Sequence, residues 1–183
     1  MSQCPLVWIV IGVAGSGKTV MGRLLSQQLE CDFVEGDRRH PLPNILKMVS
    51  HIPLQDSDRQ SWLLAMEADI QRAIALNRET VLTCSALKLS YRKQLTAPER
   101  VQIVWLNVSE AELERRLSQR TNHYMQLEML RSQIAAFEPI QPDENAIIVD
   151  GLLSPVEVVT DLLNTAIRLF PSLKKSWWQR CYE

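Results

Sequence analysis

The sequence predicts an α/β fold in which a parallel β-sheet carries helices on both faces. Short apolar runs alternate along the chain with longer amphipathic segments, and strands that pair in parallel need such helical crossovers between them. A glycine-rich turn also joins the first apolar run directly to the first amphipathic segment. The length of 183 residues suits one domain with a small lid and leaves too little chain for two independent cores.

The expected elements follow from these patterns in chain order. Strands are predicted at residues 6–11, through Phe33 and Val34, and at 80–83, 101–106 and 146–149. Helices are predicted at 18–29, 58–76 and 88–95, from Ser109 to a polar hinge near Thr121, after that hinge, and after Ser154. The segment between His40 and Asp58 is interpreted as a proline-interrupted connection. Two helix starts match the capping box, namely Ser109 with Glu112 and Ser154 with Glu157.

Charge and composition argue against several classes of protein. The chain has 20 basic and 21 acidic residues and a net charge of −1, whereas broad nucleic-acid binding needs a surplus of cations. The longest apolar stretch, residues 6–13, is far shorter than the roughly 20 residues of a membrane-spanning helix, and the start carries no secretory signal pattern. The four cysteines lack C-x-x-C spacing and there are only three histidines, so we expect reduced thiols, a cytoplasmic location and no transition-metal site.

Residues 12–19 carry the clearest chemical signal. Their sequence, GVAGSGKT, matches G-x-x-x-x-G-K-S/T and lies between an apolar strand and an amphipathic helix, where the mechanism needs it. Backbone N–H groups of such a loop surround phosphate oxygens, and the helix N-terminus adds its positive end. We expect Lys18 to bridge the β- and γ-phosphates and the Thr19 hydroxyl to bind Mg²⁺. The nucleotide-binding residues are then Gly12, Val13, Ala14, Gly15, Ser16, Gly17, Lys18 and Thr19.

A loop of this kind serves kinases, GTPases, motors and regulatory ATPases alike. The sequence has no N-K-x-D tetrapeptide for reading guanine, and no long apolar run ends in aspartate after the third strand. Both observations weaken the GTPase and motor interpretations. A glycine-rich strand-to-helix turn without a ligand is the structural alternative.

Two carboxylates follow the second predicted strand, at the sheet edge where ligands of parallel sheets bind. Phosphoryl transfer needs a base or orienting group near the attacking hydroxyl, and it needs a secured metal ion. We assign Asp37 to the first role and Glu35, through water, to the second. The alternative is that both are solvated turn residues beside basic neighbours.

Three cations are candidates for holding an anionic substrate. Arg59 falls in the first turn of a helix, where a cation is unfavourable unless an anion faces it. Asp56 and Asp58 beside it are explained by helix capping and the helix dipole. Lys88 and Arg92 are four residues apart and would share one helix face, although an ordinary solvated basic helix explains them equally well. The residues alone leave open which cation meets a substrate carboxylate.

Arg116 and Arg120 predict a lid. They lie one turn apart before the polar hinge, so both can point into one cleft when the segment closes. Arginine supplied in this way stabilises the charge of a transferred phosphoryl group and helps to exclude water. The alternative is that these cations simply suit the dipole at a helix C-terminus.

Taken together, these motifs resemble the small P-loop gluconokinases, which are related to shikimate kinases and nucleoside monophosphate kinases. The resemblance extends to about Val149. It rests on GVAGSGKT (12–19), GDRRHP (36–41), Asn44, Lys47, Met48, Pro53, Leu54, Asp56, Asp58, Arg59, Trp62, CSALK (84–88), Tyr91, Arg92, Arg116, Arg120, His123, Ser132, Gln133, Phe137, Glu138 and Pro139. It implies a P-loop fold with a parallel sheet in the order 2-3-1-4-5. For the whole chain we expect one kinase domain over residues 1–170 with a lid at about 116–130, followed by a tail over 171–183.

The resemblance also implies an activity. It points to transfer of the γ-phosphate of ATP, with Mg²⁺, to the 6-hydroxyl of D-gluconate by a homodimer, giving 6-phospho-D-gluconate and ADP. Asp37 would orient the hydroxyl, Arg116 would flank adenine, and Arg120 would reach the phosphates as a catalytic group. His40 and His123 would join the substrate-binding residues.

The chain departs from the family pattern in four places. Glu35 occupies a position where gluconokinases usually have Asp, His51 one where they usually have Gly, and Tyr124 one where they usually have Phe. The tail beyond about Phe170 is longer than the family pattern leads us to expect. Two other functions compete with the gluconokinase hypothesis. One is a small-metabolite kinase of the shikimate type, and the other is a non-catalytic nucleotide-dependent regulatory protein.

Overall fold

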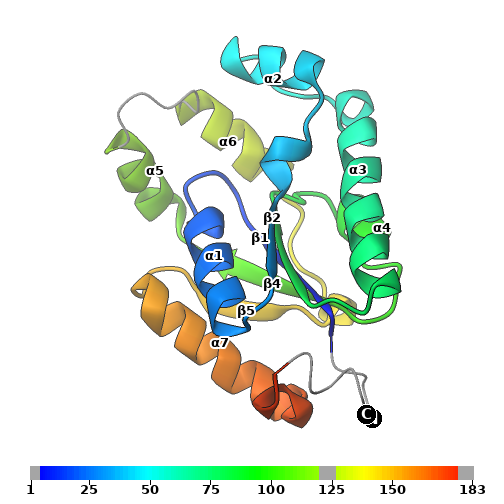
Figure 1. Ribbon diagram of the computed structural model, residues 1–183. Coiled ribbons are helices and arrows are strands. Elements are labelled where there is room, and N and C mark those ends of the chain that lie inside the picture. Colours follow the sequence, from blue (N-terminus) through cyan, green and yellow to red (C-terminus); the bar gives the residue numbers. More distant parts are fainter. Residues whose placement is uncertain (1–4, 120–126, 177–183) are drawn as a thin grey trace.

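In the computed structural model, residues 5–119 and 127–176 are described (Figure 1). The predicted site residues Arg120 and His123 lie outside the described residues, as do the hinge near Thr121 and the tail from residue 177 onward. None of the helices in the described ranges is long and apolar enough to cross a membrane.

The sheet has five parallel strands in the order β2-β3-β1-β4-β5, which confirms the predicted fold class and strand order. The central strand β1 is buried over its whole length. Successive side chains of a strand point to opposite faces, so Ile9 and Ile11 pack on one side of the sheet and Trp8 and Val10 on the other. The strands are β1 (Val7–Ile11), β2 (Asp32–Glu35), β3 (Thr80–Cys84), β4 (Val101–Asn107) and β5 (Ile147–Asp150).

Helices cover both faces of this sheet (Figure 1). On the face that carries Trp8 lie α1 (Lys18–Gln28) and α7 (Pro155–Leu169), and on the opposite face lie α3 (Asp56–Ala75) and α4 (Leu89–Leu95). A separate apolar cluster joins α5 (Glu110–Ser118) and α6 (Leu127–Ala136) beside the loop that follows β1. Short 3₁₀ helices are η1 (Gly36–Arg39), η2 (Pro142–Glu144) and η3 (Pro171–Lys174).

The helix α2 (Leu42–Val49) corrects the interpretation of its segment as a proline-interrupted connection. Pro41 is its N-cap and Pro43 lies in its first turn, where the missing N–H of proline costs no intrahelical hydrogen bond. His51 follows the helix with φ of 59°, a left-handed conformation that glycine adopts most readily. This conformation gives a physical reason for the glycine that gluconokinases usually have there.

Candidate active site

The phosphate loop joins the carboxyl end of β1 to α1. Gly15 and Gly17 have φ values of 84° and 99°, in the left-handed region that glycine tolerates best. Gly17 is the N-cap of α1, so the positive end of the helix dipole faces the inside of the loop. The Lys18 ammonium donates to the carbonyl of Val13 at 3.1 Å, which holds it against the loop.

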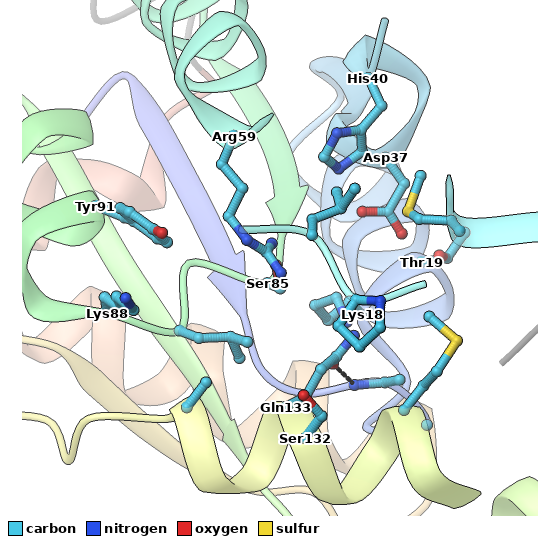
Figure 2. A pocket seen from close by; sticks show the side chains of 18 of the residues that line it. Lys18, Thr19, Asp37, His40, Arg59, Ser85, Lys88, Tyr91, Ser132 and Gln133 are labelled. Carbon is cyan, nitrogen blue, oxygen red and sulfur yellow. Dashed lines mark hydrogen bonds between the residues drawn. The ribbon is translucent and has the colours of Figure 1, made fainter. Parts of the chain in front are cut away.

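A cavity of about 270 Å³ opens in front of this loop (Figure 2). Its walls come from the phosphate loop, the helices α1, η1, α2, α3, α4 and α6, and the connections that lead into α3 and α4. The phosphate loop and the proposed acceptor residues therefore line one cavity at the carboxyl edge of the sheet, where ligands of such sheets bind. Its polar lining comprises Lys18, Thr19, Asp37, His40, Asp56, Arg59, Ser85, Lys88, Tyr91, Ser132 and Gln133.

Asp37 is carried by η1, directly after β2. The Trp62 indole N–H donates to the carbonyl of Gly36 at 2.9 Å. A Cβ at Gly36 would lie 2.2 Å from the carbonyl oxygen of Thr83, so only glycine lets η1 approach β3 this closely. These two contacts fix the start of η1, and Asp37 places its carboxylate in the cavity on the side of Thr19 (Figure 2).

His40 forms a second part of the acceptor wall. Its buried imidazole stacks on Trp62 with ring centroids 4.8 Å apart and planes 6° from parallel, and the Asn44 amide nitrogen lies 3.3 Å from Nδ1. Burial lowers the pKa of His40 from 6.5 to about 4, with Asp37 acting to raise it and Arg59 to lower it. The ring is therefore neutral at neutral pH and offers hydrogen bonds without a positive charge.

Arg59 and Lys88, two of the candidate cations, line the cavity in different surroundings. Arg59 reaches from the first turn of α3 toward the middle of the cavity (Figure 2), and its guanidinium has no ion-pair partner among the described residues. Lys88 Nζ lies 2.6 Å from Asp56 Oδ2, and the Tyr91 hydroxyl donates to the same carboxylate. These hydrogen bonds from Lys88 and Tyr91 lower the pKa of Asp56, so Asp56 stays ionised and balances Lys88. Arg59 interacts electrostatically with Asp56 and Asp58, but it forms an ion pair with neither, so its donors can meet a ligand.

The third candidate, Arg92, does not line the cavity. Its side chain is only 1% exposed and forms an ion pair with Glu144. It also donates to three backbone carbonyls. The expected shared helix face with Lys88 fails because Lys88 is the N-cap of α4 and has extended backbone angles.

Arg116 lies beside the phosphate loop and outside the cavity lining. It donates to the carbonyl of Gly151 at 2.6 Å and to that of Ser16 at 3.4 Å, and it pairs with Glu112 at 2.7 Å. Hydrogen bonds from Arg115 and Arg116 lower the pKa of Glu112 to about 2. The arginine is thus anchored where the loop enters α1.

Thr19 and Glu35 were predicted to hold a magnesium ion. The Thr19 side chain lines the cavity, whereas Glu35 is not part of its lining and accepts a hydrogen bond from the Thr83 hydroxyl at 2.7 Å. Both offer only oxygen atoms, which are the donors that Mg²⁺ prefers. No three His, Cys, Asp or Glu side chains gather into a metal site in the described ranges. The donor set therefore fits an ion that takes its other ligands from phosphates and water.

Two groups in the cavity were not predicted as site residues. Gln133 Oε1 accepts the N–H of Ala14 at 2.8 Å, and Asp56 holds Lys88 and Tyr91. No local pattern indicates the first contact, because its partners are 119 residues apart. The second is hidden because an aspartate at a helix start already has a structural explanation.

This fold and this cavity define a class of protein, the P-loop kinases that act on small metabolites. A family model described as an AAA domain matches residues 7–140. The gluconokinase of Gluconobacter oxydans is 38% identical over 164 residues, which cover 89% of this chain and 92% of the relative. The thermosensitive gluconokinase of Escherichia coli is 34% identical over 161 residues, which cover 87% and 86%.

Solved structures agree with these relatives. The crystal structure of a gluconokinase from Sinorhizobium meliloti 1021 matches with a TM-score of 0.83 and 36% identity, covering 94% of this chain and 97% of that one. Shikimate kinase from Aquifex aeolicus matches with a TM-score of 0.52 and 17% identity over 87% and 94%, and so shares the fold. The chain belongs to the gluconokinase family.

Proposed function

We propose that this chain transfers the γ-phosphate of ATP to the 6-hydroxyl of D-gluconate, forming 6-phospho-D-gluconate and ADP. One observation carries the proposal: the Arg59 guanidinium, without an ion-pair partner among the described residues, lines the same cavity as the phosphate loop and Asp37. A linear sugar acid offers a carboxylate to Arg59 and a primary alcohol to Asp37. Relatives named gluconokinase support the same substrate.

The transfer itself needs few groups. The alcohol oxygen attacks the γ-phosphorus, a new P–O bond forms, and the bond to the β,γ-bridging oxygen breaks so that ADP leaves with its electron pair. Asp37 orients the hydroxyl and accepts its proton. Lys18 balances the negative charge on the phosphate oxygens during the transfer.

The residues of the cavity that lie away from the phosphate loop select the acceptor. Arg59 binds the carboxylate with its planar fork of donors, a geometry that suits two parallel hydrogen bonds. Neutral His40 can donate to or accept from a sugar hydroxyl. The Lys88–Asp56 pair presents both donors and acceptors to the middle of the polyol chain, with little net charge.

The nucleotide side follows the family resemblance. Thr19, and Glu35 through water, would hold Mg²⁺, which when bound neutralises charge on the β- and γ-phosphates. Arg116 would flank adenine, and its anchoring beside the phosphate loop supports this position. Arg120 would reach the phosphates and His123 the substrate, as parts of a lid over about residues 116–130.

A coupled assay with ATP, Mg²⁺ and a panel of sugar acids tests the proposal. We expect turnover with D-gluconate and none with shikimate. Turnover with shikimate but not gluconate would support a kinase of the shikimate type. Nucleotide binding with no acceptor phosphorylated would support a regulatory protein, and either result overturns the proposed function.

We also propose that the enzyme is a cytoplasmic homodimer. The gluconokinase resemblance supports the dimer, and sedimentation velocity should then give a single species with the mass of two chains. The cysteines support a reducing compartment, because Cys31 and Cys84 are free thiols and burial raises the pKa of Cys84 to about 12. Fractionation of cells that express the protein tests its location.

A further inference from the structure

A side chain of α6 is built into the phosphate loop. Gln133 Oε1 accepts the main-chain N–H of Ala14 at 2.8 Å. Both residues line the cavity together with Lys18 and Asp37. Figure 2 shows Gln133 extending from α6 toward Lys18.

Packing fixes this carboxamide relative to the loop. Leu130 of α6 is fully buried in the cluster with α5, and Val13 and Ala14 of the phosphate loop pack against the same cluster. Gln133 lies three residues after Leu130, so the two side chains share a helix face. The apolar cluster and the hydrogen bond therefore fix the position of α6 relative to the phosphate loop.

The hydrogen bond also decides which end of the carboxamide faces the cavity. Because Oε1 takes the Ala14 N–H, the other end is the NH₂ group with its two donors. Within the described residues, Gln133 Nε2 has no hydrogen-bond acceptor in the protein. A fixed donor without a protein partner, in the cavity that Lys18 lines, suits an anionic oxygen.

The place of Gln133 in the cavity identifies the phosphate that it meets. The transferred group must lie between the phosphate loop and the hydroxyl that Asp37 orients, and Gln133 lines that space. Arg116, which contacts the loop at Ser16, lies outside the cavity lining, on the nucleoside side of the proposed complex. We propose that the Gln133 NH₂ group donates to the γ-phosphoryl group and stabilises it during transfer, an inference that rests on the proposed kinase reaction.

Binding of two nucleotides to the Gln133→Leu variant tests the inference. Calorimetric titrations with Mg²⁺ compare ADP with β,γ-imido-ATP, which differ in the γ-group. The variant should bind ADP within about twofold of the wild type and the imido analogue about tenfold more weakly, because it loses a hydrogen bond to a charged group. Its kcat with gluconate should fall about 100-fold, as when one donor to a developing charge is removed.

A second variant distinguishes the role of the Gln133 NH₂ group as a donor from the role of Oε1 as an acceptor for the phosphate loop. Gln133→Glu keeps an acceptor for the Ala14 N–H but replaces the NH₂ group with an anionic oxygen. Its preference for ADP over the imido analogue should exceed that of Gln133→Leu. The control is Arg131→Gln, on the same helix, where the exposed arginine pairs with Glu114. This control should change neither affinity.

Three results would overturn the inference. Equal weakening of ADP and the imido analogue in Gln133→Leu would make the residue a structural tie of the loop. Tighter binding of both nucleotides would mean that Gln133 competes with phosphate for the Ala14 N–H. Unchanged binding of both would mean that Gln133 has no role at the γ-phosphoryl group. Since these titrations contain no gluconate, they stand apart from the acceptor assay.

Discussion

Asp37 owes its position to neighbours that have no part in the chemistry. Gly36 allows the close approach to Thr83, and the Trp62 indole holds the Gly36 carbonyl. The Asp37 main-chain oxygen accepts from the His40 N–H, while the contacts that fix η1 leave its carboxylate unused. The carboxylate can therefore be changed without moving the backbone that carries it.

The Asp37→Asn variant should lose turnover and keep its nucleotide. We expect kcat to fall about 10²- to 10⁴-fold, the usual contribution of a positioned base, because the amide cannot accept the alcohol proton. ATP affinity should stay near the wild-type value, since the phosphate loop is untouched. Steady-state kinetics and nucleotide titration check both values. A fully active variant would remove Asp37 from the acceptor site.

The buried imidazole of His40 should make stability depend on pH. Its pKa in the folded state, about 4, lies below the ordinary 6.5, so between these values the unfolded chain binds more protons and stability falls as pH falls. From pH 7 to pH 5 the loss attributable to His40 is about 2 kcal/mol. Urea unfolding of the wild type and His40→Phe at both pH values measures it.

The phenylalanine variant keeps a ring for the stack on Trp62 and removes the titration, so its stability should change less over this range. Trp62→Phe serves as the control, because it lowers stability but retains His40 and the same direction of pH dependence. Carboxyl groups held by ion pairs, such as Glu144, lose their contribution below about pH 4.5. Equal pH slopes in the wild type and His40→Phe would mean that titration of His40 does not contribute to the pH dependence of stability.

The candidate cations show where prediction from sequence ends at the level of residues. Residue type and helix position identify Arg59, Lys88 and Arg92 as candidates. Which of them is available to a substrate depends on whether an acidic side chain already pairs with it. Lys88 meets Asp56 across 32 residues and Arg92 meets Glu144 across 52. No local sequence pattern indicates such pairs, because the partners are distant in the sequence and come together only through the sheet topology.

At the scale of elements, Arg92 ties α4 to η2. Its side chain and that of Glu144 are 1% and 5% exposed, and removing one member of such a buried pair leaves an uncompensated charge. Arg92→Met should therefore lower the free energy of unfolding by about 3–5 kcal/mol, while the KM for gluconate stays near the wild-type value. Urea unfolding and steady-state kinetics measure the two quantities.

A Glu144→Gln change in the Arg92→Met background supplies the matched comparison. It removes the orphaned carboxylate and should recover part of the lost stability, since the remaining neutral amide is less costly to bury. If Arg92→Met stays stable and instead raises the gluconate KM at least tenfold, Arg92 is a substrate ligand and its assignment to the core is wrong.

Both helix starts predicted from a capping box are confirmed, because Ser109 is the N-cap of α5 and Ser154 is the N-cap of α7. Ser154 accepts from the Glu157 N–H and Glu157 accepts from the Ser154 N–H, which confirms that capping box. At Ser109 only the predicted hydrogen bonds are wrong: its side chain makes no capping hydrogen bond, and the Glu112 carboxylate pairs with Arg115 and Arg116 instead. The prolines of α2 predict an interrupted connection from sequence alone, because proline starts a helix or interrupts one according to its position.

At the scale of the molecule, the parallel sheet determines where the site lies. Strands β1, β2 and β3 lead into the phosphate loop, η1 and the β3–α4 connection, and all three line one cavity. This convergence follows from strand polarity and could be predicted. The part of the cavity wall that α6 supplies could not be predicted, because the position of α6 depends on the packing of Leu130 and its neighbours against α5.

The arrangement of Arg59 and Asp37 in one cavity predicts how the enzyme selects its substrate by the carboxylate at one end and the primary alcohol at the other. D-Glucitol matches D-gluconate except that an alcohol replaces the carboxylate. If Arg59 binds the carboxylate, the wild type should prefer gluconate in kcat/KM by about 100-fold or more, as expected for a paired charge. Lys88→Gln should keep most of this preference, because Lys88 is already paired with Asp56.

Values of kcat/KM for D-gluconate and D-glucitol in the wild type and in Arg59→Gln decide whether Arg59 binds the substrate carboxylate. If it does, Arg59→Gln loses most of its activity on gluconate, little on glucitol, and nearly all of the preference between them. A variant that retains the wild-type preference would mean that the carboxylate binds elsewhere, and the proposed arrangement of acceptor and phosphate loop would be wrong.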